Sequence, residues 1–166
     1  AKWFNHQHLQ MIQDSELRFS FQRQLEEHQV SCEREELQIL IPLIKPRINF
    51  IHEIWEQSWF FFNSPAQYDE AVIKKRWKED TPEQMDGLMG ILEECEPFSP
   101  ETLEEAVKDM IEEKGWGMGA IMNAWRLLLV GAATGPGLFD LAAFLGKEEV
   151  IGRMKRGIET IESSLK

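Results

Sequence analysis

Cysteine is scarce in this sequence, and its scarcity excludes a fold built on disulfide bonds. The chain has only Cys32 and Cys95 among 166 residues. So few cysteines are typical of a reducing compartment, so a cytoplasmic location is expected. No apolar run reaches the roughly 18 residues that a membrane helix needs, and no signal peptide is visible. We therefore expect no membrane partner.

Patterns that carry catalysis or bind metals are missing as well. The four histidines do not combine with the cysteines into a zinc-binding spacing, and no set of segments resembles a Ser–His–Asp triad. The glycine-rich stretch Gly115–Gly119 lacks the preceding strand and the spacing of a dinucleotide loop, so it is predicted to be a linker. We predict no catalytic residue, no metal and no cofactor in this chain.

Positive charge is in deficit, with 18 Lys and Arg against 29 Asp and Glu, but the deficit is local. Residues 79–113 carry one base and 13 acids, a net charge of −12. The net charge is −1 over residues 1–78 and +2 over residues 114–166. Because RNA needs local cations rather than a basic total, composition does not exclude nucleic acid. The acidic segment leaves an alternative open, an acidic all-helical module that binds another protein.

No stretch alternates as a strand would, so the predicted fold class is all-α. A helix is predicted from Asp14 or Ser15 to about Gln29, with Leu17, Phe21 and Leu25 on one face. Ser31 is predicted to cap the next helix, whose apolar residues include Leu37, Leu40, Ile41 and Ile44 and which Pro46 should break.

Three Ser/Thr–Pro pairs are typical of helix starts and predict helices near 65–78, 82–95 and 100–114. Thr81 and Gln84 fit a capping box. An amphipathic helix is predicted over 148–165. The pair Ser64–Pro65 marks a boundary, so we expect two small helical subdomains, 1–64 and 65–166, in an arrangement of packed helices.

Aromatic and basic clusters allow both structural and functional readings. The aromatic-rich stretch Ile48–Phe62 is expected to be core rather than a base-stacking surface. The basic run Lys74–Lys78 fits either phosphate contacts or a solvated helix face. The aromatic and polar segment Trp3–Leu9 shows no clear period. It fits either a frayed end with two buried aromatic residues or an ordered segment that leads into the helices.

The most informative stretch runs from Asn123 to Arg153. The apolar run Ile121–Val130 is interrupted by one cation, Arg126, and a Gly/Pro turn separates it from a second apolar run, Leu138–Leu145. These features predict two short buried helices joined by a tight loop. A buried guanidinium is costly unless it is paired. Arg126 should therefore meet an internal carboxylate or reach an external anion or base.

This stretch resembles the C-terminal anticodon-binding domain of bacterial glutamyl-tRNA synthetases. The shared motifs are Arg126 in its apolar run, Pro136-Gly137-Leu138, Leu145-Gly146-Lys147-Glu148 and the later Arg153. The segment Lys45-Pro46-Arg47-Ile48 is similar to a further motif of the family. One departure is Gly135, where members often carry a larger, hydrogen-bonding residue.

The resemblance implies a tRNA recognition module. Arg126 with Pro136, Gly137 and Leu138 would hold the first two anticodon bases, and Arg47 would read the third. Family members with arginine at that position tend to charge only the glutamate tRNA. The implied partners are tRNA(Glu) and the protein's own catalytic domain, in a monomer.

The nucleotide-binding signatures of the family's catalytic half, H-I-G-H and K-M-S-K-S, are not in this sequence. ATP and magnesium would therefore be bound by a catalytic domain outside this chain. The first residue is Ala1 rather than Met, which also indicates a piece of a longer chain.

Overall fold

The computed structural model describes residues 2–166, except for the side chain of Phe4, and every regular element in that range is helical. It contains nine α-helices and three short 3-10 turns. The all-α prediction is confirmed. The chain divides into two compact units, Ala1–Phe62 and Asn63–Lys166, where the sequence placed a boundary at residue 64.

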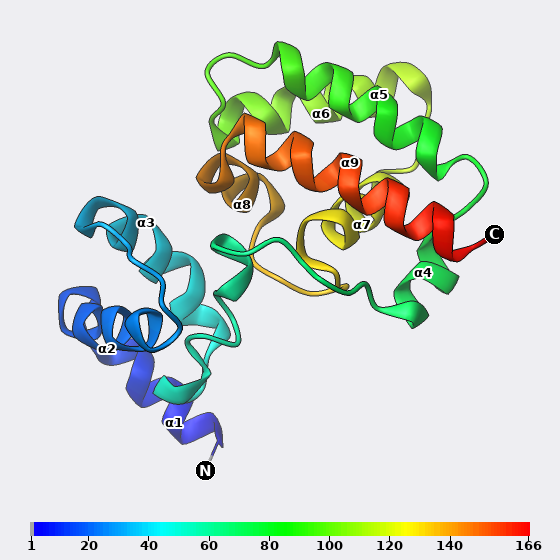
Figure 1. Cartoon of the computed structure of the whole chain (residues 1–166). Helices are drawn as coiled ribbons and strands as arrows, with labels where there is room; N and C mark the ends of the chain where they lie inside the picture. Colours follow the sequence, from blue (N-terminus) through cyan, green and yellow to red (C-terminus); the bar gives the residue numbers. More distant parts are fainter. Residues whose placement is uncertain (1) are drawn as a thin grey trace. The chain divides into compact units, whose positions relative to one another are not determined.

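The first unit contains α1 (Lys2–Met11), α2 (Asp14–Glu27) and α3 (Arg34–Ile44) (Figure 1). Three 3-10 turns follow α3: η1 (Lys45–Arg47), η2 (Ile51–Glu53) and η3 (Trp59–Phe61). The helices α2 and α3 pack against each other through the apolar faces predicted from their spacing. All seven predicted residues are buried: Leu17, Phe21, Leu25, Leu37, Leu40, Ile41 and Ile44.

The predicted starts of α2 and α3 are wrong by one or two residues. Gln13 precedes α2, and Asp14 lies within its first turn. Glu33 rather than Ser31 caps α3, because Glu33 and Glu36 form a reciprocal capping box. Two backbone N–H groups gain partners in that arrangement, which a single serine cannot provide.

The N-terminal segment differs from one of its two readings, the frayed end with two buried aromatic residues. Residues 2–11 form the regular helix α1, and the side chain of Trp3 is 72% exposed rather than buried. In the later aromatic cluster, Ile54, Phe60 and Phe61 are buried, as expected of core residues. Trp55 is only half-buried and stacks on His28 with ring centroids 4.1 Å apart. The cluster thus packs the end of α2 onto the turns that follow α3.

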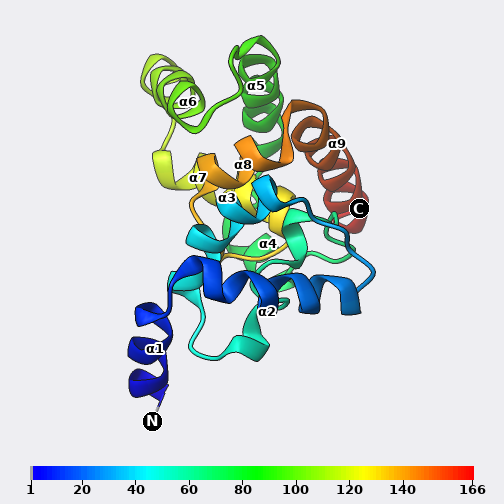
Figure 2. The same ribbon diagram turned by 90° about the vertical axis from the view of Figure 1, so that its left-hand side faces the viewer.

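The second unit contains α4 (Glu70–Arg76), α5 (Thr81–Glu94), α6 (Pro100–Lys114), α7 (Met118–Val130), α8 (Leu138–Leu145) and α9 (Lys147–Ser164). The last helix packs against α5, α7 and α8, and α6 packs against α5 and α8. Both views show α5 and α6 side by side (Figures 1 and 2). The apolar helix α7 lies inside this arrangement, and seven of its residues are buried.

Only one of the three Ser/Thr–Pro predictions is confirmed in detail. Ser99 caps α6, and its hydroxyl accepts a hydrogen bond from the backbone N–H of Thr102. Thr81 instead lies inside α5, and its hydroxyl accepts from the backbone N–H of Lys78. Its predicted partner Gln84 donates to Asp80, so the capping box is wrong.

Ser64 is not a cap, because α4 begins six residues later, at Glu70. Asp69 caps that helix and accepts from the N–H groups of Ala71 and Val72. An aspartate carboxylate is a strong capping group, and Asp69 is further held by its own N–H bond to Gly131. This tertiary hydrogen bond was not visible in the local sequence.

Candidate nucleic-acid interface

The end of α7 is fixed by a glycine that no other residue could replace without strain. Gly131 has a left-handed backbone with φ 84° and donates to the carbonyl of Leu127. A Cβ at this position would lie 2.5 Å from the backbone oxygen of Gln67. The carbonyl of Gly131 accepts a hydrogen bond from the backbone N–H of Asp69 at 2.8 Å. The segment before α4 therefore determines where α7 stops and the Gly/Pro turn begins.

Arg153 provides a second support for the end of α7. Its side chain is 1% exposed, and Nη1 donates to the carbonyl of Leu129 at 2.9 Å. Nε donates to the carboxylate of Glu149 at 2.8 Å. Burial lowers the pKa of Arg153, and Glu149 partly opposes that shift. The sequence identified Arg153 only as part of the shared motif and did not show that it is buried.

Arg126 lies on the last turns of α7 and is held by the turn that follows. Its Nη1 donates to the carbonyl oxygen of Pro136 at 2.8 Å. This partner is a backbone carbonyl ten residues away, a kind of partner that the sequence did not predict. The structure thus brings Arg126 and Pro136 together into one site, at the junction of α7 and α8.

The three residues of the Pro136-Gly137-Leu138 turn differ in what they present to solvent. Pro136 and Leu138 are buried, and Gly137 is exposed. Gly137 also precedes α8 as its N-cap, and its carbonyl accepts from the N–H of Leu141. The turn consequently offers backbone groups at Gly137, while its two larger side chains pack inward. A ligand at this turn would meet the peptide and the half-buried guanidinium of Arg126.

Arg47, the third predicted contact, lies in the other unit at the end of η1. The turn is held from two sides: Lys45 donates to the carbonyl of Ile12 and to Asp14, and its own carbonyl accepts from Gln10 at 2.8 Å. Arg47 is half-buried, and its buried Nε has no hydrogen-bond partner among the described residues. An anchored backbone therefore carries a guanidinium with an unsatisfied N–H group.

Lys147 of the Leu-Gly-Lys-Glu motif turns out to be structural. Its ammonium donates to the carbonyl of Glu93 at 3.0 Å and to the carboxylate of Glu96 at 2.7 Å. It thereby satisfies a carbonyl at the end of α5, where a cation is favoured by the helix dipole. In the basic run, Lys74, Lys75 and Lys78 are exposed. Their exposure fits both phosphate contacts and a solvated helix face.

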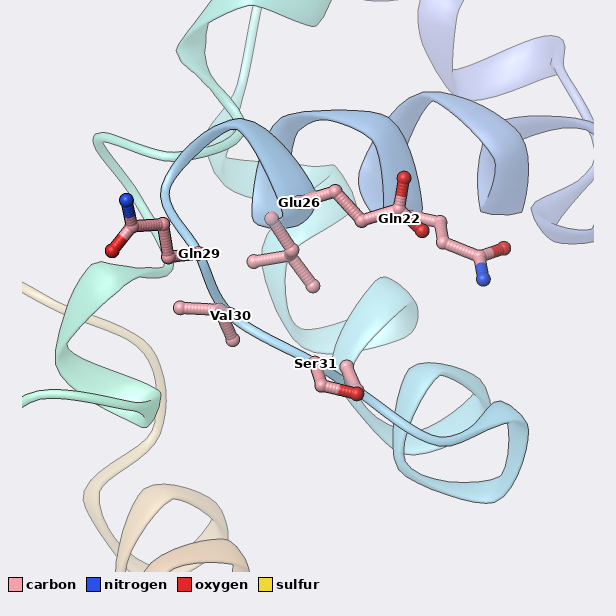
Figure 3. Close-up of a pocket in the computed structure, with 7 residues that line it drawn as sticks. Gln22, Glu26, Gln29, Val30 and Ser31 are labelled. Atoms are coloured by element: carbon pink, nitrogen blue, oxygen red, sulfur yellow. The ribbon is translucent and has the colours of Figure 1, made fainter.

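A pocket of about 220 Å³ lies elsewhere in the first unit, beside the end of α2 and the segment leading to α3 (Figure 3). Cys32 lines it together with Glu26 and Gln29. Burial, and then the charges of Glu36 and Glu33, raise the pKa of Cys32 to about 11. A thiol with a raised pKa is a weak nucleophile at neutral pH.

Within residues 2–166, no group of three His, Cys, Asp or Glu side chains is placed to hold a metal ion. In the same part of the chain, no helix is both long enough and apolar enough to cross a membrane.

The family model for the anticodon binding domain matches residues 10–158. The chain therefore belongs to the anticodon-binding domain family. That match includes Arg47, Arg126 and the Pro136–Leu138 turn.

Among individual proteins, the chain is similar to glutamate–tRNA ligases. It is 46% identical over 161 residues to the glutamate–tRNA ligase of Porphyromonas gingivalis, covering 97% of this chain and 32% of the relative. The identity to the ligase of Bacteroides thetaiotaomicron is 44% over 160 residues, with 96% and 32% covered. The chain thus spans about a third of the length of these relatives.

Solved structures give the same match. The crystal structure of a glutamate–tRNA ligase from Elizabethkingia meningosepticum, in complex with its amino acid, superimposes with a TM-score of 0.91 at 36% identity, over 96% of this chain and 32% of that one. The enzyme from Elizabethkingia anophelis superimposes with a TM-score of 0.86 at 34% identity, over 95% and 31%. The helical arrangement described above is therefore that of the corresponding third of these ligases.

Proposed function

We propose that this chain recognises the anticodon of tRNA(Glu) as the RNA-binding part of a glutamate–tRNA ligase. The contact that carries the proposal is the hydrogen bond from Arg126 to Pro136, since it joins the cation and the exposed turn into one site. A guanidinium is planar and carries several N–H donors, so it can form paired hydrogen bonds with the edge of a base. Splayed anticodon bases present such edges.

The distribution of charge supports an RNA site at the α7–α8 junction. The exposed side of α6 is rich in acids, including Glu101, Glu104, Glu105, Glu112 and Glu113, and it would repel phosphates. Residues 114–166, which contain the junction, carry a net charge of +2. RNA would approach that region, with binding weakened strongly by salt.

The proposal assigns the chemistry of ligation to the parts of the enzyme outside this chain. ATP and magnesium would be bound there, and this chain would supply recognition without a cofactor of its own. We place the protein in the cytoplasm, supported by the scarcity of cysteine. We also propose that it acts as a monomer. In its first unit, Arg47 would read the third anticodon base.

Binding of an anticodon stem-loop of tRNA(Glu) tests the proposal. Fluorescence anisotropy at low salt measures the affinity for this stem-loop. Arg126→Ala should weaken the binding free energy by about 1–3 kcal/mol, the value of a bidentate base contact. Lys166→Ala removes the exposed cation of the last residue and is the matched control. It should change the affinity little.

Thermal denaturation separates recognition from folding. If Arg126→Ala melts much earlier and binds as the parent does, Arg126 only braces the turn. If neither the parent nor the variants bind the stem-loop in preference to an unrelated hairpin, the alternative of an acidic protein-binding module is favoured.

A further inference from the structure

Gly135 occupies a place in the turn where the backbone does not require glycine. The glycines of the second unit with positive φ are Gly115, Gly131 and Gly146, and Gly135 is not among them. Position 135 precedes a proline, which favours an extended backbone that any residue adopts. The reason for glycine at this position must therefore lie in the space around it.

That space is filled by Arg126. A Cβ built on Gly135 would lie 2.7 Å from Nη1 of Arg126, and the next nearest side-chain neighbour, Val130, is 3.8 Å away. Nη1 is the same nitrogen that donates to the carbonyl of Pro136 at 2.8 Å. Glycine at 135 is thus what allows the guanidinium to lie against the turn and to form this bond.

We propose that Gly135 is a positioning residue for anticodon recognition, because its missing side chain sets the orientation of the Arg126 guanidinium. The inference rests on the function proposed above. A guanidinium held by Pro136 has its other N–H groups fixed in direction before a base arrives. Ordering it in advance lowers the entropy cost of binding.

The substitution Gly135→Ala is well suited to this question. The added methyl meets the far end of a flexible side chain, so the guanidinium moves while the backbone stays. By contrast, a methyl at Gly131 would meet the backbone oxygen of Gln67. Gly90→Ala is a matched control, since a Cβ at Gly90 meets no atom within 4 Å.

The experiment measures affinity for the tRNA(Glu) anticodon stem-loop in a double-mutant cycle. Gly135→Ala should weaken binding about three- to tenfold, the effect of one lost hydrogen bond, while Gly90→Ala leaves it unchanged. In the Arg126→Ala background, Gly135→Ala should have no further effect, because residue 135 acts only through Arg126. The melting temperature of Gly135→Ala should stay within a few degrees of the parent value.

Each other outcome overturns the inference in a recognisable way. If Arg126→Ala weakens binding and Gly135→Ala does not, Arg126 reads RNA independently of residue 135. An equal loss in both backgrounds, or a large fall in melting temperature, would show that the methyl disturbs the turn itself. If the parent chain does not discriminate between stem-loops with altered anticodons, the proposed function fails, and this inference fails with it.

Discussion

At the scale of single residues, the two predicted base-reading arginines are held in different ways. Arg126 is braced by a hydrogen bond to Pro136, whereas the buried Nε of Arg47 has no partner among the described residues. A buried N–H group without an acceptor costs free energy until a partner arrives. Because Nε has almost no exposed surface while the side chain is only half-buried, the carbonyl of a base would meet the terminal N–H groups of Arg47 instead. The surrounding turn is held to the region of α1 and α2 by Lys45, so little backbone ordering would be needed on binding.

Arg47 should therefore discriminate between tRNAs that differ in the third anticodon base. Glutamate and glutamine tRNAs carry cytosine and guanine there. An arginine offers only donors, so it meets the carbonyl of cytosine but is opposed by the amino and imino donors of guanine. In the full-length enzyme, Arg47→Gln should lower the preference for the glutamate tRNA, measured as the ratio of kcat/KM for the glutamate and glutamine tRNAs, by about tenfold. Arg34→Gln, at an exposed site on α3, serves as the control. An unchanged ratio would remove Arg47 from the site.

Residue-level prediction from sequence worked where side-chain type was decisive and failed where a backbone group was the partner. The apolar run around Arg126 showed that this cation needed a partner, but the carbonyl of Pro136 carries no side-chain signature. The burial of Arg153 was not predicted for the same reason, since one of its partners is the backbone carbonyl of Leu129. One signal could have identified it: Arg153 shares the apolar face of α9 with Val150 and Met154, all of them buried.

At the scale of elements, the end of α7 is the best-supported point of the second unit. Gly131 ends the helix, Asp69 donates to the Gly131 carbonyl and Arg153 donates to that of Leu129. The last carbonyls of a helix lack intrahelical partners, so these contacts satisfy groups that would otherwise be left open. They also fix where the Gly/Pro turn starts.

Loss of the Arg153 contact should destabilise the fold. Arg153→Met keeps much of the apolar volume but leaves the buried carbonyl of Leu129 without its donor, which should cost about 1–3 kcal/mol in the free energy of unfolding. Arg156→Met, at a side chain that is 56% exposed, should change it by less than about 0.5 kcal/mol. Urea denaturation measures both. Equal stability of the two variants would mean that water replaces the guanidinium at this helix end.

The sequence predicted the presence of these helices better than the residues at which they begin. The periodicity of α2, α3, α6 and α9 is carried by side chains that are buried, so the pattern and the packing agree. The start of α4 depends on Asp69, whose backbone is held by Gly131 more than 60 residues away. A local Ser–Pro signal at residue 64 cannot compete with that tertiary contact.

At the scale of the whole chain, the predicted recognition residues are divided between the two units. Arg126 and the Pro136–Leu138 turn belong to Asn63–Lys166, and Arg47 belongs to Ala1–Phe62. Each unit has its own buried apolar residues, so each set of contacts depends on a separate core. Recognition of the first two anticodon bases should accordingly be separable from recognition of the third.

A shortened chain of residues 63–166 tests this separation. It retains α4 to α9 and every contact described around Arg126, so it should fold, as judged by a helical circular dichroism spectrum and a cooperative melt. Binding to stem-loops altered at one anticodon position at a time should then show discrimination at the first and second positions and none at the third. The same shortened chain with Arg126→Ala is the control and should lose discrimination at those two positions. Retained discrimination at the third base would contradict the assignment of that base to Arg47. Loss at all three positions by a folded fragment would mean that the first unit is required for the Arg126 site as well.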